Sequence, residues 1–164
     1  MKVINEDYLR STMFGLQDGL VSTTGVVVGI STGVQSKEII ILAALVAVMV
    51  EASSMAAGQY SSEKAVHQMD KTGKHTDNLL VGAGLMFISY LSAGLVPILP
   101  ILILDRVDTR IYSIICALFA MLVIGYVKGK VVDHKPLRSA IELFVLGSIA
   151  TSIGIIVGQI LKIH

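Results

Sequence analysis

The sequence predicts an all-α integral membrane protein with five transmembrane helices. Of the 164 residues, 54% are hydrophobic and only 15% are charged, whereas about 25% of the residues of soluble proteins are charged. The mean hydropathy is +0.77. A helix needs about 20 apolar residues to cross a bilayer, and five runs approach or exceed that length. Four of them carry no charge and the fifth is interrupted only by Glu51: 19–36, 78–104, 111–127, 143–161 and 39–62.

These runs define the order of the expected helices along the chain. Five spans of about 20 residues use most of the sequence, so we expect one transmembrane domain over 1–164 and no soluble domain. A polar cytoplasmic connector is expected over 62–78. The expected helices cover approximately 13–33, 39–61, 79–104, 111–127 and 139–161.

Lysine and arginine residues predict the orientation, because loops on the cytoplasmic side of a membrane carry an excess of them. Four basic residues fall on one side: Lys37, Arg106, Arg110 and Lys162. Nine fall on the other side: Lys2, Arg10, Lys64, Lys71, Lys74, Lys128, Lys130, Lys135 and Arg138. We therefore expect a cytoplasmic N-terminus and, after an odd number of spans, a C-terminus outside the cytosol or in a lumen.

Several function classes are unlike this sequence. Its composition does not fit a disordered chain, a basic nucleic-acid-binding domain or a disulfide-rich secreted module. It contains no glycine-rich phosphate loop, paired-cysteine cluster or nucleophile elbow. We expect neither an enzyme nor a nucleic-acid partner, and no permanently bound cofactor.

Two carboxylates, Asp18 and Glu51, interrupt the apolar spans. A charge near the bilayer centre costs about 2.5–3.5 kcal/mol on insertion scales, so such groups usually face a bundle interior or a water-filled path. A single buried acid is explained equally well by a structural hydrogen bond between helices. Two acids in so small a bundle favour a functional role.

The second span offers a row of potential metal ligands on one face. Glu51 and Met55 are four residues apart and share a helix face. Gln59 and Glu63 continue the row toward the cytoplasm. Oxygen ligands with one thioether suit a borderline first-row divalent ion better than Mg²⁺ or Ca²⁺. Met55 alone would be read as core filling, and it becomes a ligand candidate because Glu51 shares its face.

The connector contains further potential ligands, at spacings that match no closed zinc site. It could be a solvated linker, or it could continue the second helix into the cytoplasm as far as Gly73. The candidate contacts to a cytoplasmic metal ion are His67, Met69, Asp70, His75 and Asp77.

Small residues and prolines mark possible contact and bending points. Helices associate in lipid where small residues let their backbones approach, and this predicts either tight packing within the chain or a dimer seam. The glycines in question are Gly15, Gly19, Gly25, Gly29 and Gly58. Pro97 and Pro100 predict a kink in the third span, because proline removes a backbone donor. The kink could be a gate or a static bend.

Two segments resemble the signature of the vacuolar iron transporter family. The first runs from Asp18 to Gly25 (DGLVSTTG), and the second from Glu51 to Tyr60 (EASSMAAGQY). Phe14-Gly15 and the later proline pair are similar too, and the resemblance covers all five expected helices.

The resemblance implies five-helix homodimers in a bilayer that move Fe²⁺, and often Mn²⁺, out of the cytosol in exchange for protons. It places Asp18, Glu51 and Met55 along the ion path near the dimer interface. Co²⁺ and Zn²⁺ are possible further substrates. The membrane would be the cell's inner membrane in a prokaryote, and the vacuole or another endomembrane in a eukaryote.

The sequence also departs from the family pattern. Gln59 stands where relatives often carry Glu, and Glu51 where many carry Asp. The connector is too short for the acidic cytoplasmic insert of the plant-type transporters, so the chain resembles a short form without that metal-binding insert. Two other functions stay open at this point: a proton-coupled exporter of small organic cations and a non-transporting membrane scaffold.

Overall fold

The computed structural model describes residues 5–70, 77–104, 109–133 and 135–162. These residues form α-helices joined by short connections, as expected for an all-α protein. The helices are α1 (Glu6–Gly33), α2 (Lys37–Met69), α3 (Leu79–Leu95), α4 (Leu99–Ile103), α5 (Thr109–Val131) and α6 (Pro136–Ile160).

Short polar side chains determine where the first three helices begin. The Asn5 side chain accepts hydrogen bonds from the backbone amides of Asp7 and Tyr8, at 2.9 and 3.2 Å. Ser36 caps α2 and Asn78 caps α3 in the same way. Such caps satisfy amide groups that have no partner inside the helix. The cap at Asn5 lets α1 begin about two turns before the apolar run, whereas the sequence suggested a start near Met13.

The third expected span is not one helix, because α3 ends at Leu95 and α4 begins at Leu99. Pro97 has no N–H to offer the Ala93 carbonyl, which instead accepts from the Val96 amide at 3.1 Å. The backbone hydrogen bonds in this segment therefore join residues three positions apart instead of four. The Ser113 hydroxyl donates to the carbonyl of Pro97 at 2.8 Å. The expected kink is therefore a break between two helices, braced by α5.

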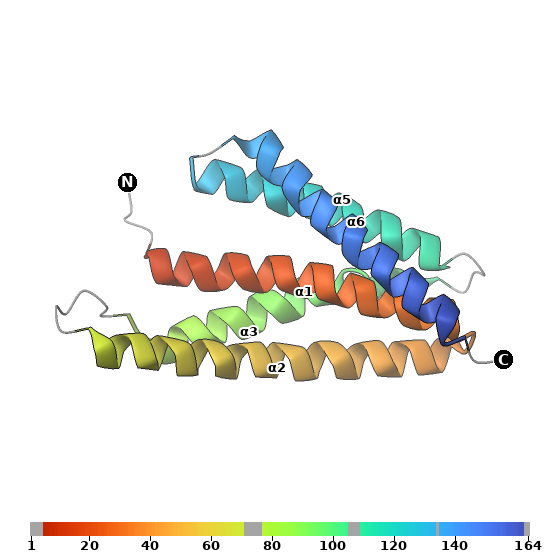
Figure 1. Cartoon of the computed structure of the whole chain (residues 1–164), viewed down its shortest axis with the longest axis horizontal. Helices are drawn as coiled ribbons and strands as arrows, with labels where there is room; N and C mark the ends of the chain where they lie inside the picture. The colour runs from red at the N-terminus through yellow and green to blue at the C-terminus, as the bar shows by residue number, and fades with distance from the viewer. Residues whose placement is uncertain (1–4, 71–76, 105–108, 134, 163–164) are drawn as a thin grey trace.

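Helix α1 lies at the centre of the bundle and contacts α2, α3, α5 and α6. In Figure 1, α1 lies between α2 on one side and the tilted pair of α5 and α6 on the other. The end of α2 and the starts of α1, α3 and α6 gather at one end of the molecule (Figure 1). This is the end that the basic residues predict to be cytoplasmic.

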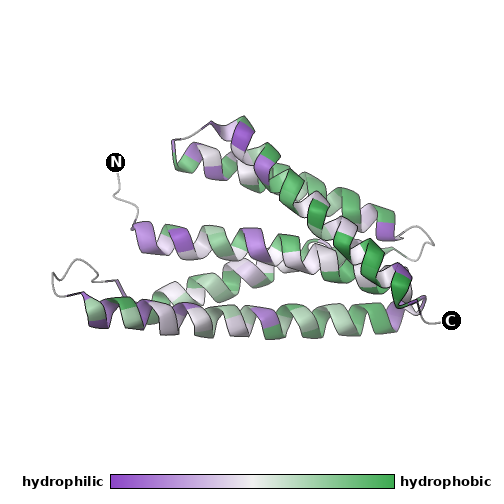
Figure 2. Cartoon of the chain, viewed as in Figure 1, coloured by the Kyte–Doolittle hydropathy of each residue, from purple (hydrophilic) through white to green (hydrophobic). Residues whose placement is uncertain are grey.

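Among the described residues, four helices are long and apolar enough to cross a membrane: α1, α2, α5 and α6. Many large apolar side chains on α2, α5 and α6 are exposed, among them Leu42, Phe119 and Ile153. Figure 2 shows α5 and α6 coloured mostly as hydrophobic, while hydrophilic positions recur along α1 and at the end of α2. An apolar exterior around a more polar interior fits lipid as the solvent, and we describe the chain as a multi-pass membrane protein.

Glycines of α1 bring two other helices into backbone contact. A Cβ atom at Gly19 would lie 2.9 Å from the Tyr90 Cα atom of α3. A Cβ atom at Gly29 would lie 3.2 Å from the carbonyl oxygen of Gly154 in α6, and Gly25 meets Ala150 at the same distance. Gly19 therefore lets α1 pack closely on α3, and Gly25 and Gly29 let it pack closely on α6, all within one chain.

Candidate functional site

Helix α2 carries a row of functional groups along the side that meets α1 and α3. The row repeats every four residues, so it winds only slowly around the helix. With a rise of 1.5 Å per residue, it extends for about 24 Å along α2. Its members are Glu51, Met55, Gln59, Glu63 and His67.

At the inner end of this row, Glu51 is hydrogen-bonded to two other helices. Its Oε2 atom accepts from the Ser22 hydroxyl of α1 at 3.1 Å. The Tyr90 hydroxyl of α3 also donates to Oε2, and the Ser22 and Tyr90 hydroxyl oxygens lie in close contact beside it. Tyr90 is almost completely buried. A carboxylate inside the bundle is thereby held in place by hydroxyl groups from α1 and α3.

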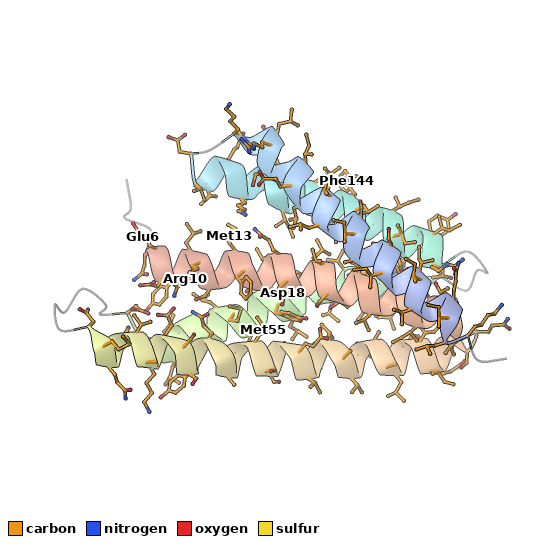
Figure 3. The ribbon with its side chains drawn as sticks, in the orientation of Figure 1. Glu6, Arg10, Met13, Asp18, Met55 and Phe144 are labelled. Carbon is orange, nitrogen blue, oxygen red and sulfur yellow. The ribbon has the colours of Figure 1, made fainter. Side chains whose placement is uncertain are left out.

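Asp18 lies one helical turn before Ser22 on α1, and Met55 lies one turn after Glu51 on α2. The carboxyl groups of Asp18 and Glu51 are near enough for each charge to disfavour the other. Met55 packs against the apolar cluster that contains Tyr90 and Ala52. Figure 3 shows Asp18 and Met55 in the space between α1 and α2, whereas Met13 lies on the other side of α1. We refer to Asp18, Ser22, Glu51, Met55 and Tyr90 as the Glu51 cluster.

The middle of the row is a second hydrogen-bond network. The Gln59 side-chain amide donates to Ser11 of α1 at 2.9 Å and to Glu63 Oε1 at 3.0 Å. The Arg10 guanidinium forms an ion pair with the same Glu63 oxygen. Glu63 is 3% exposed, and its Oε2 atom has no hydrogen-bond partner within the described part of the chain.

His67 and Asp77 complete the row at the end of α2. His67 Nε2 lies 2.9 Å from Asp77 Oδ1. One oxygen of Glu63, one ring nitrogen of His67 and one oxygen of Asp77 all lie within 4.8 Å of one another. We refer to Arg10, Glu63, His67 and Asp77 as the Glu63 cluster.

The other candidate residues are not part of these clusters. Met69 is 80% exposed, and Asp70 is the C-cap residue of α2. His75 lies outside the described residues. Gly58 has nothing within 4 Å of the position that a Cβ atom would take, so it is the one candidate glycine that makes no close contact in the described structure.

The structure adds partners that the sequence did not single out: Ser11, Ser22, Tyr90 and Arg10. Tyr90 had a detectable signal, because it is the only tyrosine in the charge-free run 78–104. A buried tyrosine hydroxyl generally has a hydrogen-bond partner, and a carboxylate in a neighbouring span is a natural acceptor. Ser11 and Ser22 gave no such signal, since serines also occur at small-residue packing positions.

Comparison with known proteins identifies the relatives of this bundle. The model of the VIT family matches residues 9–80 and 64–159, which together cover most of the chain. The chain belongs to the VIT family. Vacuolar iron transporter 1 of Arabidopsis thaliana is 33% identical over 76 residues, 46% of this chain and 30% of the relative. Vacuolar iron transporter 2 of Oryza sativa subsp. japonica is 35% identical over 74 residues, 44% of this chain and 30% of the relative.

A longer match comes from vacuolar iron transporter homolog 3 of Arabidopsis thaliana. It is 27% identical over 158 residues, 89% of this chain and 79% of the relative. By contrast, the matches to the first two transporters span less than a third of those proteins. Membership of the VIT family confirms the resemblance seen in the two sequence motifs.

Proposed function

We propose that this VIT family member exports Fe²⁺ or Mn²⁺, or both, from the cytosol through a path lined by α1 and α2. The observation that carries the proposal is the Glu51 cluster, in which a carboxylate bonded to Ser22 and Tyr90 shares the interior of an apolar bundle with a second carboxyl group and a thioether. A divalent ion that crosses the bilayer must exchange its water ligands for protein ligands, and carboxylates also balance its charge.

The composition of the cluster favours transition metals as substrates. Asp18, Glu51 and two hydroxyl groups offer hard oxygen ligands, and Met55 adds one polarisable sulfur. Such a mixed set suits first-row divalent ions, Fe²⁺ and Mn²⁺ among them, with Co²⁺ and Zn²⁺ as competing substrates. The relatives from Arabidopsis thaliana and Oryza sativa described above carry the name vacuolar iron transporter, which supports iron as one substrate.

The proposed topology has five spans with the N-terminus in the cytosol. Helices α3 and α4 together form the third span, since α3 alone is only 17 residues long. The break between them can be accommodated in lipid because Ser113 and the three-residue turns satisfy the freed backbone groups. The end of the bundle that carries the Glu63 cluster then faces the cytosol.

Proton antiport is part of the proposal. A cation bound between Asp18 and Glu51 competes with protons for the same carboxyl oxygens. Metal binding from the cytosol therefore releases protons, and protonation from an acidic far side ejects the metal. Uptake into vesicles should increase as the receiving side is made more acidic.

We also propose a homodimer, with a seam different from the one that the sequence suggested. The α1 glycines contact α3 and α6 of the same chain, so they leave little surface for a partner. The exposed small residues of α2, which include Ser54, Ala57 and Gly58, provide an alternative seam beside the row of functional groups.

Transport by purified protein in sealed vesicles tests the proposal. Uptake of Fe²⁺, Mn²⁺, Co²⁺ and Zn²⁺ is measured with a pH gradient set in each direction. Asp18→Asn and Glu51→Gln keep the side-chain shape and remove the charge, and each should lower uptake at least about 100-fold. The matched control is Glu142→Gln, an exposed carboxylate on α6 that pairs with Arg138 one turn away, and it should transport normally.

The same assay distinguishes the alternatives. Uptake of an organic cation in place of metal would indicate an exporter of that class. No uptake of either kind would indicate a scaffold. Wild-type rates in both neutral variants would show that the two carboxyl groups are structural and would contradict the proposed path.

A further inference from the structure

The Glu63 cluster lies well away from the Glu51 cluster. Twelve residues separate Glu51 from Glu63, which corresponds to about 18 Å along α2. Helix α2 has 33 residues, a length of about 50 Å, whereas the hydrocarbon core of a bilayer is about 30 Å thick. The Glu63 cluster therefore lies at or beyond the membrane surface, at the end of the bundle where α1 begins and α2 ends (Figure 1).

Three elements hold the potential ligands of this cluster in place. Glu63 and His67 are four residues apart on α2 and so share one face. Asp77 precedes Asn78, the N-cap residue of α3, whose backbone amide donates to the Tyr8 hydroxyl of α1 at 2.8 Å. The ligand-bearing residues are thus positioned by packed helices, which reduces the cost of assembling a site.

Burial and charge indicate that the negative charge of the Glu63 cluster is incompletely compensated. The side chains of Glu63 and Asp77 are 4% and 3% exposed, and buried carboxylates require a compensating charge or hydrogen bonds. Arg10 and Gln59 both contact Glu63 Oε1. Glu63 Oε2 is buried and has no hydrogen-bond partner among the described residues, so part of this carboxylate is left unsatisfied.

We propose that Glu63, His67 and Asp77 form a divalent-metal site that is separate from the Glu51 cluster. The site supplies two carboxylate oxygens and one imidazole nitrogen, and water completes the coordination shell. The three ligand atoms lie within 4.8 Å of one another. Metal–ligand bonds of about 2.1 Å place neighbouring ligand atoms about 3.0–3.4 Å apart, so the most distant pair must approach by at most about 1.5–2 Å.

This ligand set selects for certain metals. The imidazole nitrogen favours first-row transition ions over Mg²⁺ and Ca²⁺, which prefer oxygen ligands alone. The absence of sulfur from these three side chains disfavours Cu⁺. The expected occupants are Mn²⁺, Fe²⁺, Co²⁺ and Zn²⁺, the same class as the substrates in the transport proposal. In the proposed transport function, this site would take up metal from the cytosol before the metal enters the path. Metal binding at the site does not itself depend on transport.

Arg10 acts in this site as the cation that the metal replaces. Its guanidinium pairs with Glu63 Oε1 and lies 3.6 Å from Asp7, while its side chain is 60% exposed. An exposed arginine can swing into water when a divalent ion takes over the charge of Glu63. Removing Arg10 should therefore tighten metal binding, whereas removing a ligand should weaken it.

Metal binding measured without transport tests the site. The full chain carries Asp18→Asn and Glu51→Gln in every sample, so that the Glu51 cluster does not contribute. Mn²⁺ is titrated into the detergent-solubilised protein, and free Mn²⁺ is quantified by electron paramagnetic resonance. We expect one Mn²⁺ per chain, with Mg²⁺ at tenfold excess failing to displace it.

Three further variants in this background decide the assignment. His67→Ala and Asp77→Asn should each weaken Mn²⁺ binding at least about 30-fold, a loss comparable to the removal of a ligand or its close support. Arg10→Gln should tighten binding several-fold. Glu142→Gln is the matched control and should bind as the parent does, and circular dichroism verifies that every variant keeps its helices.

The outcomes separate this proposal from the transport proposal. Binding that survives both His67→Ala and Asp77→Asn, or that is absent from the parent, overturns the site whatever the transport assay shows. Binding that is lost in both ligand variants and strengthened in Arg10→Gln supports it, even if the vesicle assay finds no uptake. Equal weakening by Arg10→Gln would show that the arginine stabilises the cluster and would overturn its role as the displaced cation.

Discussion

The two halves of α1 perform different tasks with similar small residues. From its start to Ser22, α1 presents Ser11, Asp18 and Ser22 to α2 and α3, where they join hydrogen bonds and charge interactions around Glu51 and Glu63. Its second half presents Gly25 and Gly29 to α6, where there is only close backbone contact.

The difference separates function from packing within one helix. In the first half, small residues leave room for polar groups from three helices to meet. In the second half, small residues bring two helices so close that no side chain fits between them. Substitutions of Gly25 or Gly29 should therefore disturb folding, and substitutions of the polar residues Asp18 and Ser22 should mainly disturb transport.

The largest effect is expected at the α1–α6 contact. A Cβ atom at Gly154 would meet the Gly25 carbonyl group and lie 3.2 Å from the Gly29 amide nitrogen. Gly154→Leu should cost about 3 kcal/mol, at the upper end of the usual range for overpacking. Thermal unfolding in detergent should show a large drop in Tm or loss of the folded protein. A normal Tm would mean that α6 does not pack on α1 as described.

A smaller effect is expected at Tyr90. Tyr90→Phe keeps the ring in its buried position and removes the hydroxyl that donates to Glu51. The loss of one hydrogen bond to a charged group costs about 1.5–3 kcal/mol, so Tm should fall by several degrees, and metal uptake should fall roughly tenfold because Glu51 is no longer held in place. Initial rates in vesicles measure the first quantity. Uptake equal to that of the wild type would show that the Tyr90 hydroxyl has no role in transport.

Met55→Leu should have a still weaker effect that depends on the metal. Leucine has a similar volume and keeps the apolar contacts near Tyr90, but it lacks the sulfur. Uptake of Fe²⁺ should fall by roughly threefold to tenfold relative to uptake of Mn²⁺, which depends less on a soft ligand. Competition between the two ions in one vesicle preparation measures this ratio. An unchanged ratio would show that Met55 only fills space.

The smallest effect on the fold is expected at Gly58. No atom lies within 4 Å of the position that its Cβ would occupy, so Gly58→Leu should leave Tm of the bundle nearly unchanged. The same substitution at Gly154 provides the contrast. If α2 forms the proposed dimer seam, Gly58→Leu should convert a dimer into a 17.5 kDa monomer. Mass measurement in nanodiscs would reveal it, and a persistent dimer would place the seam elsewhere.

The sequence by itself determined the class of fold and the main carboxylates. Long charge-free runs predict membrane helices because backbone groups in lipid must be satisfied within a helix. Asp18 and Glu51 stood out because charged residues are rare in such runs. The four-residue spacing of Glu51, Met55, Gln59 and Glu63 placed them on one face without any knowledge of the neighbouring helices.

The tertiary structure alone decided which groups meet. Tyr90 and Glu51 are 39 residues apart, and no local pattern joins Arg10 to Glu63 or His67 to Asp77. The same holds for the glycines, because a small residue permits close approach without specifying which helix approaches. A helix pattern determines which residues share a face, and the packing of the whole bundle determines what that face touches.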